Sequence, residues 1–301
     1  MPDARRKITV ATLAALKSRG EKAVVAAVYD YPTAVFADRA GVDMLLVGDS
    51  AAMTVLGHAN TLSITMTEML VFARAVARGA RRAFVIGDLP FLSYQAADED
   101  AVRNAGAFVA AGCDSVKCEG GARVAARVRA MTGAGIAVMG HLGLTPQALG
   151  QQGGYRVQGK TLAAVERVLD DALALQEAGA FAILLEALPA ESASYIREHL
   201  DVLVYGIGAG PAMDGQLVIS HDILGNFVGE ITPRFVRRFA NLDSIVEGAF
   251  REYAAEVRAG RFPAPAQCYA IDPAEAAAIR AAIRGRPAPK TVPPRLQCAP
   301  S

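Results

Sequence analysis

Acidic residues follow three apolar runs of this sequence at the points where buried strands would end. Asp49 comes after "DMLLVG", Asp88 after "AFVIG" and Glu186 after "FAILL". Runs of Val, Ile and Leu with little polar alternation are typical of strands covered on both faces, as in a parallel sheet. One such acid is an ordinary loop residue, but three at equivalent places indicate a chemical site.

Other polar side chains end neighbouring apolar runs and extend this candidate site. Ser50 follows Asp49 directly. Lys117 and Glu119 are two residues apart, so on a strand they share one face, while Cys118 points the other way and is interpreted as a packing residue. His141, at the end of "IAVMGH", could assist proton transfer or orient a ligand, and it could equally be structural.

The three acids Asp49, Asp88 and Glu119 would crowd together if these strands were neighbours in a barrel. Adjacent carboxylates repel and raise one another's pKa, and a divalent cation removes the repulsion. Oxygen ligands without cysteine or paired histidine favour Mg²⁺ over Zn²⁺. The acids could instead cap helices or pair with basic side chains. Lys117 is expected to hold a substrate carboxylate or to pair with one of the acids.

Glu186 ends an almost wholly apolar run, and partial desolvation would raise its pKa and make it a usable base. A base together with a carbonyl-polarising metal suits the removal of a proton next to a carbonyl. The alternative is that Glu186 caps the helix expected after it.

Eight apolar runs alternate with Ala-rich segments of helical spacing, and this arithmetic is typical of a (β/α)8 TIM barrel. A doubly wound sheet usually has fewer strands. We predict one barrel over residues 1–265 with an N-terminal amphipathic helix, and a C-terminal extension over 266–301 that is partly helical and then Pro-rich. The predicted strands are 23–29, 43–49, 83–88, 115–120, 136–141, 181–186, 201–208 and 216–222.

Composition narrows the class of protein. The 301 residues are 52% hydrophobic and 20% charged with a net charge of +1, which predicts a compact globular protein with no affinity for nucleic acid. No uninterrupted apolar stretch of about 18 residues predicts a membrane span, and charges interrupt the first apolar segment too early for a signal peptide. The four cysteines lack metal or redox spacing, so we expect reduced thiols and a cytoplasmic location.

The Gly- and Gln-rich segment 150–160 is expected to be a mobile lid or a substrate-facing loop.

Seven segments in order resemble the ketopantoate hydroxymethyltransferase family between about residues 8 and 262. They are "YDYPTAVFADRAGVDMLLVGDSAAMTVLGH", "GDLPF", "VKCEGG", "GHLGLTPQ", "GGYRVQGK", "LLEALP" and "GIGAGPAMDGQLVISHD". The resemblance implies an Mg²⁺-dependent (β/α)8 barrel related to the phosphoenolpyruvate mutase/isocitrate lyase-like superfamily, assembled as a homodecamer. It also implies transfer of a hydroxymethyl group from 5,10-methylenetetrahydrofolate to the oxoacid 3-methyl-2-oxobutanoate, giving 2-dehydropantoate and tetrahydrofolate in pantothenate biosynthesis.

By the same resemblance, each matching residue takes a role. "SAAM" at 50–53 and Cys118 depart from the family pattern, which leaves the substrate fit beside the metal site in question. The implied roles are metal and oxoacid binding for Asp49 and Asp88, oxoacid binding for Ser50 and Lys117, metal binding through water for Glu119, and proton acceptance for Glu186.

The sequence disfavours two other functions. A related metal-dependent lyase or mutase is disfavoured because no "KxCGH"-like motif occurs. A non-catalytic paralogue is disfavoured because the candidate acids and Lys117 are all present.

Overall fold

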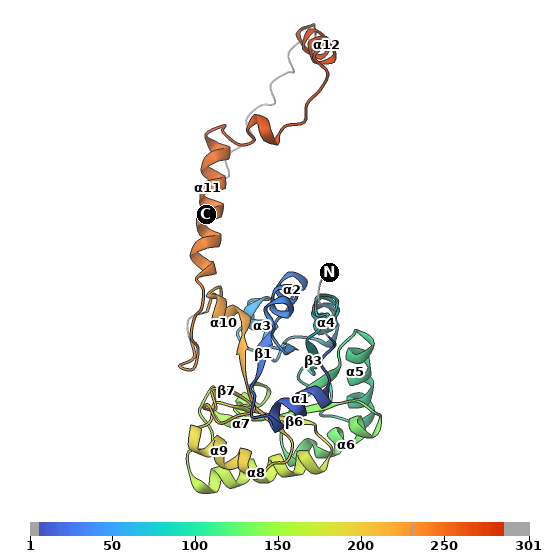
Figure 1. The fold of residues 1–301 in the computed structure, drawn as a ribbon, viewed down its shortest axis with the longest axis vertical. Helices are drawn as coiled ribbons and strands as arrows, with labels where there is room; N and C mark the ends of the chain where they lie inside the picture. The colour runs from blue at the N-terminus through green and yellow to red at the C-terminus, as the bar shows by residue number, and fades with distance from the viewer. Residues whose placement is uncertain (1–5, 230–231, 286–301) are drawn as a thin grey trace, which may run out of the picture. The chain divides into compact units, whose positions relative to one another are not determined.

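The computed structural model describes residues 6–229 and 232–285, and by its contacts the chain divides into two compact units, Met1–Asp243 and Ser244–Ser301. The first unit contains a closed barrel of eight parallel strands in chain order, which confirms the predicted (β/α)8 class (Figure 1). The strands are β1 (Ala23–Ala27), β2 (Met44–Val47), β3 (Phe84–Asp88), β4 (Ser115–Glu119), β5 (Val138–Gly143), β6 (Ala182–Glu186), β7 (Leu203–Ile207) and β8 (Gly215–Ile219).

Helices cover the outside of the barrel, so that the middle strands are buried on both faces (Figure 1). Local sequence explains two of the helix starts. Thr65 and Glu68 form a reciprocal cap at the start of α4, and the acidic run from Asp98 opens α5. The helices of this unit are α1 (Val10–Ser18), α2 (Tyr31–Ala40), α3 (Ala51–Thr54), α4 (Met66–Gly79), α5 (Asp98–Ala110), η1 (Ala122–Val124), α6 (Ala125–Gly133), η2 (Pro146–Ala148), α7 (Leu149–Gln152), α8 (Leu162–Glu177), α9 (Ala190–Glu198) and α10 (Ser220–Leu224).

The connection between β7 and β8 contains no helix, so the expectation of eight complete strand–helix units is wrong at this step. Residues 208–214 form only turns and bends. Gly208 and Gly210 both take positive φ, which turns the chain back within a few residues and leaves no length for a helix.

The late part of the chain contains two α-helices within its described residues. These are α11 (Leu242–Arg258) and α12 (Pro273–Arg284), with a short η3 (Pro265–Gln267) between them. The Pro-rich segment predicted after residue 285 lies outside the described residues. The predicted boundary at 265/266 stays a prediction, whereas the contacts divide the chain at Asp243. Among the residues that the structure describes, no helix is both long and apolar enough to cross a membrane.

Gly87 sets the closeness of β3 and α5. A Cβ atom built on Gly87 would lie 2.3 Å from the Cδ1 atom of Phe108, which is itself fully buried. Real Cβ atoms do not approach other atoms so closely, so glycine is the residue that lets this ring pack directly on the strand. The contact fixes β3 immediately before its last residue, Asp88.

Gly87→Ala is therefore expected to destabilise the protein by about 1–3 kcal/mol, the usual cost of overpacking a well-filled core. Thermal unfolding followed by circular dichroism measures the effect. Gly106→Ala is the matched control, because a Cβ atom at Gly106 on α5 meets nothing within 4 Å. Replacing a helical glycine there is expected to be neutral or to stabilise by up to about 1 kcal/mol. Equal melting temperatures for Gly87→Ala and the unsubstituted protein would contradict the packing argument.

Candidate active site at the carboxyl ends of the strands

The carboxyl ends of the strands bring the predicted residues together at one end of the barrel. Asp49 comes just after β2, Asp88 closes β3 and Glu119 closes β4. The strand register places Asp88 beside Lys117 and Glu119 beside His141. All five side chains are buried, so they form a cluster of ionisable groups in the barrel interior.

Lys117 contacts most members of this cluster. Its Nζ atom lies 2.8 Å from Asp88 Oδ1, 3.5 Å from Glu119 Oε1 and 3.2 Å from His141 Nδ1. Burial disfavours the charged ammonium, but Asp88, Glu119 and Asp49 outweigh burial and raise the pKa of Lys117. Lys117 is therefore a buried cation, and the predicted pairing with the acids is present. Its expected contact with a substrate carboxylate stays a prediction.

Asp49 and Asp88 are held against each other. The backbone N–H of Asp49 donates to Asp88 Oδ2 at 3.0 Å, and Asp49 Oδ2 accepts from Gln147 Nε2 at 3.0 Å. Burial, followed by the charges of Asp88 and Glu119, raises the pKa of Asp49 well above its usual value. Burial also raises the pKa of Asp88, although Lys117 opposes this. Burial and the neighbouring acids thus oppose the ionisation of this pair, and a bound cation would offset that opposition.

His141 connects the cluster to Glu186, which closes β6. Its Nδ1 atom is 3.3 Å from Glu119 Oε1 and its Nε2 atom is 3.1 Å from Glu186 Oε2. Burial and Lys117 oppose the imidazolium, yet the nearby carboxylates of Glu119 and Glu186 outweigh them and raise the pKa of His141 to about 9. The imidazole is therefore protonated near neutral pH and places a positive charge beside Glu186.

The helix-cap alternatives are wrong. The N-cap of α9 is Pro189, with no side-chain cap, so Glu186 does not cap it. The N-caps of α3 and α5 are Ser50 and Ala97, and that of η1 is Gly121. Glu186 is also less enclosed than its apolar strand suggests, because 17% of its side chain is exposed. A partly open carboxylate at the rim can reach a bound molecule.

Two other predicted residues have defined surroundings. The Ser50 hydroxyl lies 2.8 Å from the hydroxyl of Tyr29, so it is oriented from β1, and its role toward substrate stays a prediction. Cys118 is fully buried, and burial raises the pKa of its thiol to about 12. A protonated, enclosed thiol is not a nucleophile, which supports its interpretation as a packing residue.

Gln147 and Tyr94 also contact the acids, although neither was predicted from the sequence. Gln147 lies in η2, after β5, and its side chain reaches Asp49. The Tyr94 hydroxyl accepts from the backbone N–H of Glu119 at 2.8 Å and lies 2.9 Å from Gln147 Oε1. Neither residue ends an apolar run, so the rule that located the acids passes over both. The only local signal is a polar residue directly after Pro146 in "GHLGLTPQ".

The segment 150–160 crosses the rim above these groups. The Tyr155 hydroxyl donates to Met53 Sδ at 3.5 Å, just after β2, and Gln158 N–H donates to the carbonyl of Ala187 at 3.0 Å, just after β6. Partial burial raises the pKa of Tyr155, and the charges of nearby Asp49, Glu186 and Glu119 add to this. The segment thus lies over the acids, and its service as a substrate-facing lid stays a prediction.

Asp49, Asp88 and Glu119 are the candidate ligands for a divalent cation. Within residues 6–229 and 232–285, no group of three or more His, Cys, Asp or Glu side chains is arranged to hold one metal ion. Mg²⁺ commonly takes one or two carboxylates and keeps the other positions for water and substrate, which the pair Asp49 and Asp88 fits. Asp88 Oδ1 contacts Lys117 and its Oδ2 accepts from Asp49 N–H. Glu119 has more contacts than Asp88, because Gln147 N–H donates to Oε2 at 2.9 Å and both Lys117 and His141 contact Oε1.

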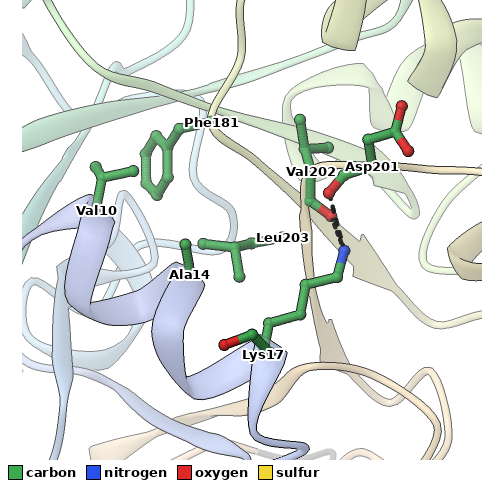
Figure 2. Close-up of a pocket in the computed structure, with 8 residues that line it drawn as sticks. Val10, Ala14, Lys17, Phe181, Asp201, Val202 and Leu203 are labelled. Atoms are coloured by element: carbon green, nitrogen blue, oxygen red, sulfur yellow. Dashed lines mark hydrogen bonds between the residues drawn. The ribbon is translucent and has the colours of Figure 1, made fainter.

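A cavity of about 450 Å³ lies at the opposite end of the barrel, beneath α1 (Figure 2). Apolar atoms of Val10, Phe181 and Leu203 line it, and the Lys17 ammonium donates to the carbonyl of Val202 at 2.6 Å. None of the predicted site residues lines this cavity. The predicted acids converge instead at the carboxyl ends of the strands.

Solved structures share this fold. A phosphonopyruvate hydrolase complexed with oxalate and Mg²⁺ superposes with a TM-score of 0.58 at 16% identity, covering 92% of this chain and 97% of that one. A 2,3-dimethylmalate lyase, described as a phosphoenolpyruvate mutase/isocitrate lyase superfamily member, gives 0.54 at 18% identity with the same coverage. At these identities the likeness shows the barrel fold alone.

Sequence relatives are much more similar. The 3-methyl-2-oxobutanoate hydroxymethyltransferase of Alkaliphilus metalliredigens (strain QYMF) is 49% identical over 267 residues, covering 88% of this chain and 94% of that protein. The enzyme of the same name from Syntrophobacter fumaroxidans (strain DSM 10017 / MPOB) is 50% identical over 262 residues, covering 87% and 92%. Residues 7–265 match the family model described as ketopantoate hydroxymethyltransferase. With its acids, lysine and histidine gathered at one rim of the barrel, this chain belongs to the ketopantoate hydroxymethyltransferase family.

Proposed function

We propose that this chain transfers a hydroxymethyl group to 3-methyl-2-oxobutanoate, with the carbon supplied by 5,10-methylenetetrahydrofolate and the hydroxyl oxygen by one water molecule. The products are 2-dehydropantoate and tetrahydrofolate, in pantothenate biosynthesis. The observation that carries the proposal is the contact at 3.1 Å between His141 and Glu186, a base on the same rim as the buried pair Asp49 and Asp88. The named relatives supply the substrate, and the geometry supplies the groups that the reaction needs.

Glu186 is the proton acceptor in this proposal. Its partly exposed carboxylate takes the proton from C3 of the oxoacid, and the electron pair of that bond forms the carbon nucleophile that attacks the one-carbon unit. His141 Nε2, 3.1 Å from Glu186 Oε2, fixes the direction of the carboxylate. The other oxygen of Glu186 is left to meet the substrate.

Asp49 and Asp88 would hold Mg²⁺, and Glu119 would act through a water molecule. When bound, the cation would polarise the carbonyl of the oxoacid and so acidify C3. Lys117 neutralises Asp88 and Glu119 and presents a positive charge to the oxoacid carboxylate. Ser50, oriented by Tyr29, would donate a hydrogen bond to the oxoacid. The folate would enter beneath the 150–160 segment. We also propose a homodecamer, a cytoplasmic location and a barrel that spans residues 1–265.

Deuterium exchange at C3 of 3-methyl-2-oxobutanoate, followed by proton NMR in D₂O with Mg²⁺, tests the base. Glu186→Gln is expected to lower the exchange rate by about 10²–10⁴, the usual contribution of a positioned base. Cys118→Ala is the matched control and is expected to keep the rate, because its thiol is enclosed. Undiminished exchange in Glu186→Gln refutes the assignment, and cleavage of a malate-like acid without exchange would favour a lyase.

Removal of divalent metal tests the cation. Dialysis against EDTA is expected to reduce C3 exchange to the rate without enzyme, and added Mg²⁺ is expected to restore it, because the acids alone do not polarise the carbonyl. Asp49→Asn and Asp88→Asn are expected to raise the Mg²⁺ concentration needed for half-maximal exchange. Full exchange by metal-free protein rules the cation out.

The pH dependence of stability tests the His141 contacts in metal-free protein. The pKa of His141 is raised from 6.5 to about 9 in the folded chain, so its contribution is complete below pH 6.5 and is lost as pH rises through about 9. The difference in melting temperature between the unsubstituted protein and His141→Gln is expected to shrink over this window. NMR of the imidazole gives the midpoint directly, and a midpoint below 6.5 is incompatible with the pairing.

A further inference from the structure

We propose that Gln147 is a positioning residue for the cation site, because it fixes the carboxylates of Asp49 and Glu119 in the directions that cation binding requires. The inference rests on the proposed function, since it concerns the same cation. It adds a residue that is neutral and does not itself ligate the ion. The chain supplies Gln147 from η2, on the connection that follows β5, although the two acids come from β2 and β4.

The amide of Gln147 has a partner at every hydrogen-bonding position. Its Nε2 group donates to Asp49 Oδ2 at 3.0 Å and to the carbonyl of Leu89 at 2.9 Å. Its Oε1 atom accepts from Gln95 Nε2 at 3.0 Å and lies 2.9 Å from the Tyr94 hydroxyl. Two donors and two acceptor lone pairs are all that a glutamine amide possesses. The buried side chain therefore has no unpaired group that would favour another orientation.

The orientation of the amide is determined by its neighbours. Turning it over would place the amide oxygen against the Asp49 carboxylate and the Leu89 carbonyl, which are both acceptors. It would also place NH₂ against Gln95 Nε2. Both contacts are repulsive, so the NH₂ group must face Asp49. This orientation holds Asp49 Oδ2, while Asp49 Oδ1 forms no hydrogen bond with the described part of the chain and is left for a cation.

The backbone of Gln147 fixes the second acid. Its N–H donates to Glu119 Oε2 at 2.9 Å. Tyr94 supports the same arrangement, because its hydroxyl accepts from Glu119 N–H and lies within 2.9 Å of Gln147 Oε1. One residue thus contacts carboxylates from two strands that have β3 between them. Partners of this kind, one step removed from the ion, commonly change metal affinity by about 10–100-fold when they are replaced.

The test is the affinity for Mn²⁺ alone, measured by electron paramagnetic resonance on full-length protein at 25 °C without oxoacid or folate. Gln147→Met keeps the length of the side chain and removes its amide, and the Kd for Mn²⁺ is expected to rise about 10–100-fold. Gln151→Met is the matched control, because Gln151 lies on the same connection and contacts Arg123 instead of an acid. Its Kd is expected to stay within twofold of the unsubstituted protein.

A second variant protects the test against a folding defect. Tyr94→Phe removes one hydroxyl from the network and is expected to raise the Kd about two- to tenfold, in line with the loss of one buried hydrogen bond. Melting temperatures of the metal-free proteins are recorded in parallel. A purely structural role would lower the melting temperature of Gln147→Met and leave its Kd, measured well below melting, unchanged, which would overturn the inference.

The outcomes separate the two proposals. If the unsubstituted protein binds Mn²⁺ and Gln147→Met binds it equally well, the inference on Gln147 fails and the proposed cation site stands. If Gln147→Met does not fold, an unchanged Kd in Tyr94→Phe overturns the inference. If the unsubstituted protein binds no Mn²⁺, the cation in the proposed function fails and the inference fails with it.

Discussion

The buried ammonium of Lys117 is the interaction on which the rest of the site depends. Three carboxylates inside a barrel would be unstable together without a nearby positive charge, because each carboxylate loses its hydration on burial. Lys117 contacts Asp88 and Glu119 at once and lies beside His141. The barrel register makes this possible, since Lys117 pairs with Asp88 across the sheet. The cost of a charged interior is thereby offset by charges on adjacent strands.

The carboxylates along the rim differ in how many contacts each one makes, and this difference suits them to different roles. Glu119 has contacts to both oxygens, so it orients other groups more than it binds. Burial and the nearby Asp88 and Glu119 raise the pKa of Asp49 well above its usual value, and part of the Glu186 side chain is exposed. One side of the rim therefore attracts a cation and the other can accept a proton. Asp49, Asp88, Glu119 and Glu186 are all carboxylates, so the differences between them come from their neighbours.

The sequence was sufficient for the parts that depend on chain-local patterns. Apolar runs located all eight strands, and the residues closing them gave Asp88, Glu119 and Glu186 because carboxyl ends of parallel strands meet at one end. Gln147 and Tyr94 were not predicted because they lie on the connections that follow strands. No periodicity in a connection indicates which side chain points inward. The link between β7 and β8 escaped for a similar reason. Counting strands leads to the expectation of a helix between each pair of strands. The positive φ at Gly208 and Gly210 shows that the chain between β7 and β8 turns too tightly to form a helix.

The two ends of the 153–160 crossing are fastened with unequal strength. On the β6 side, Gln158 N–H and the Ser192 hydroxyl make ordinary hydrogen bonds to backbone carbonyls. On the β2 side, Tyr155 reaches only a thioether, a weak acceptor. The attachment beside Met53 is therefore the weaker of the two. If this crossing opened, it would open first on the side of Asp49 and stay fastened on the side of Glu186.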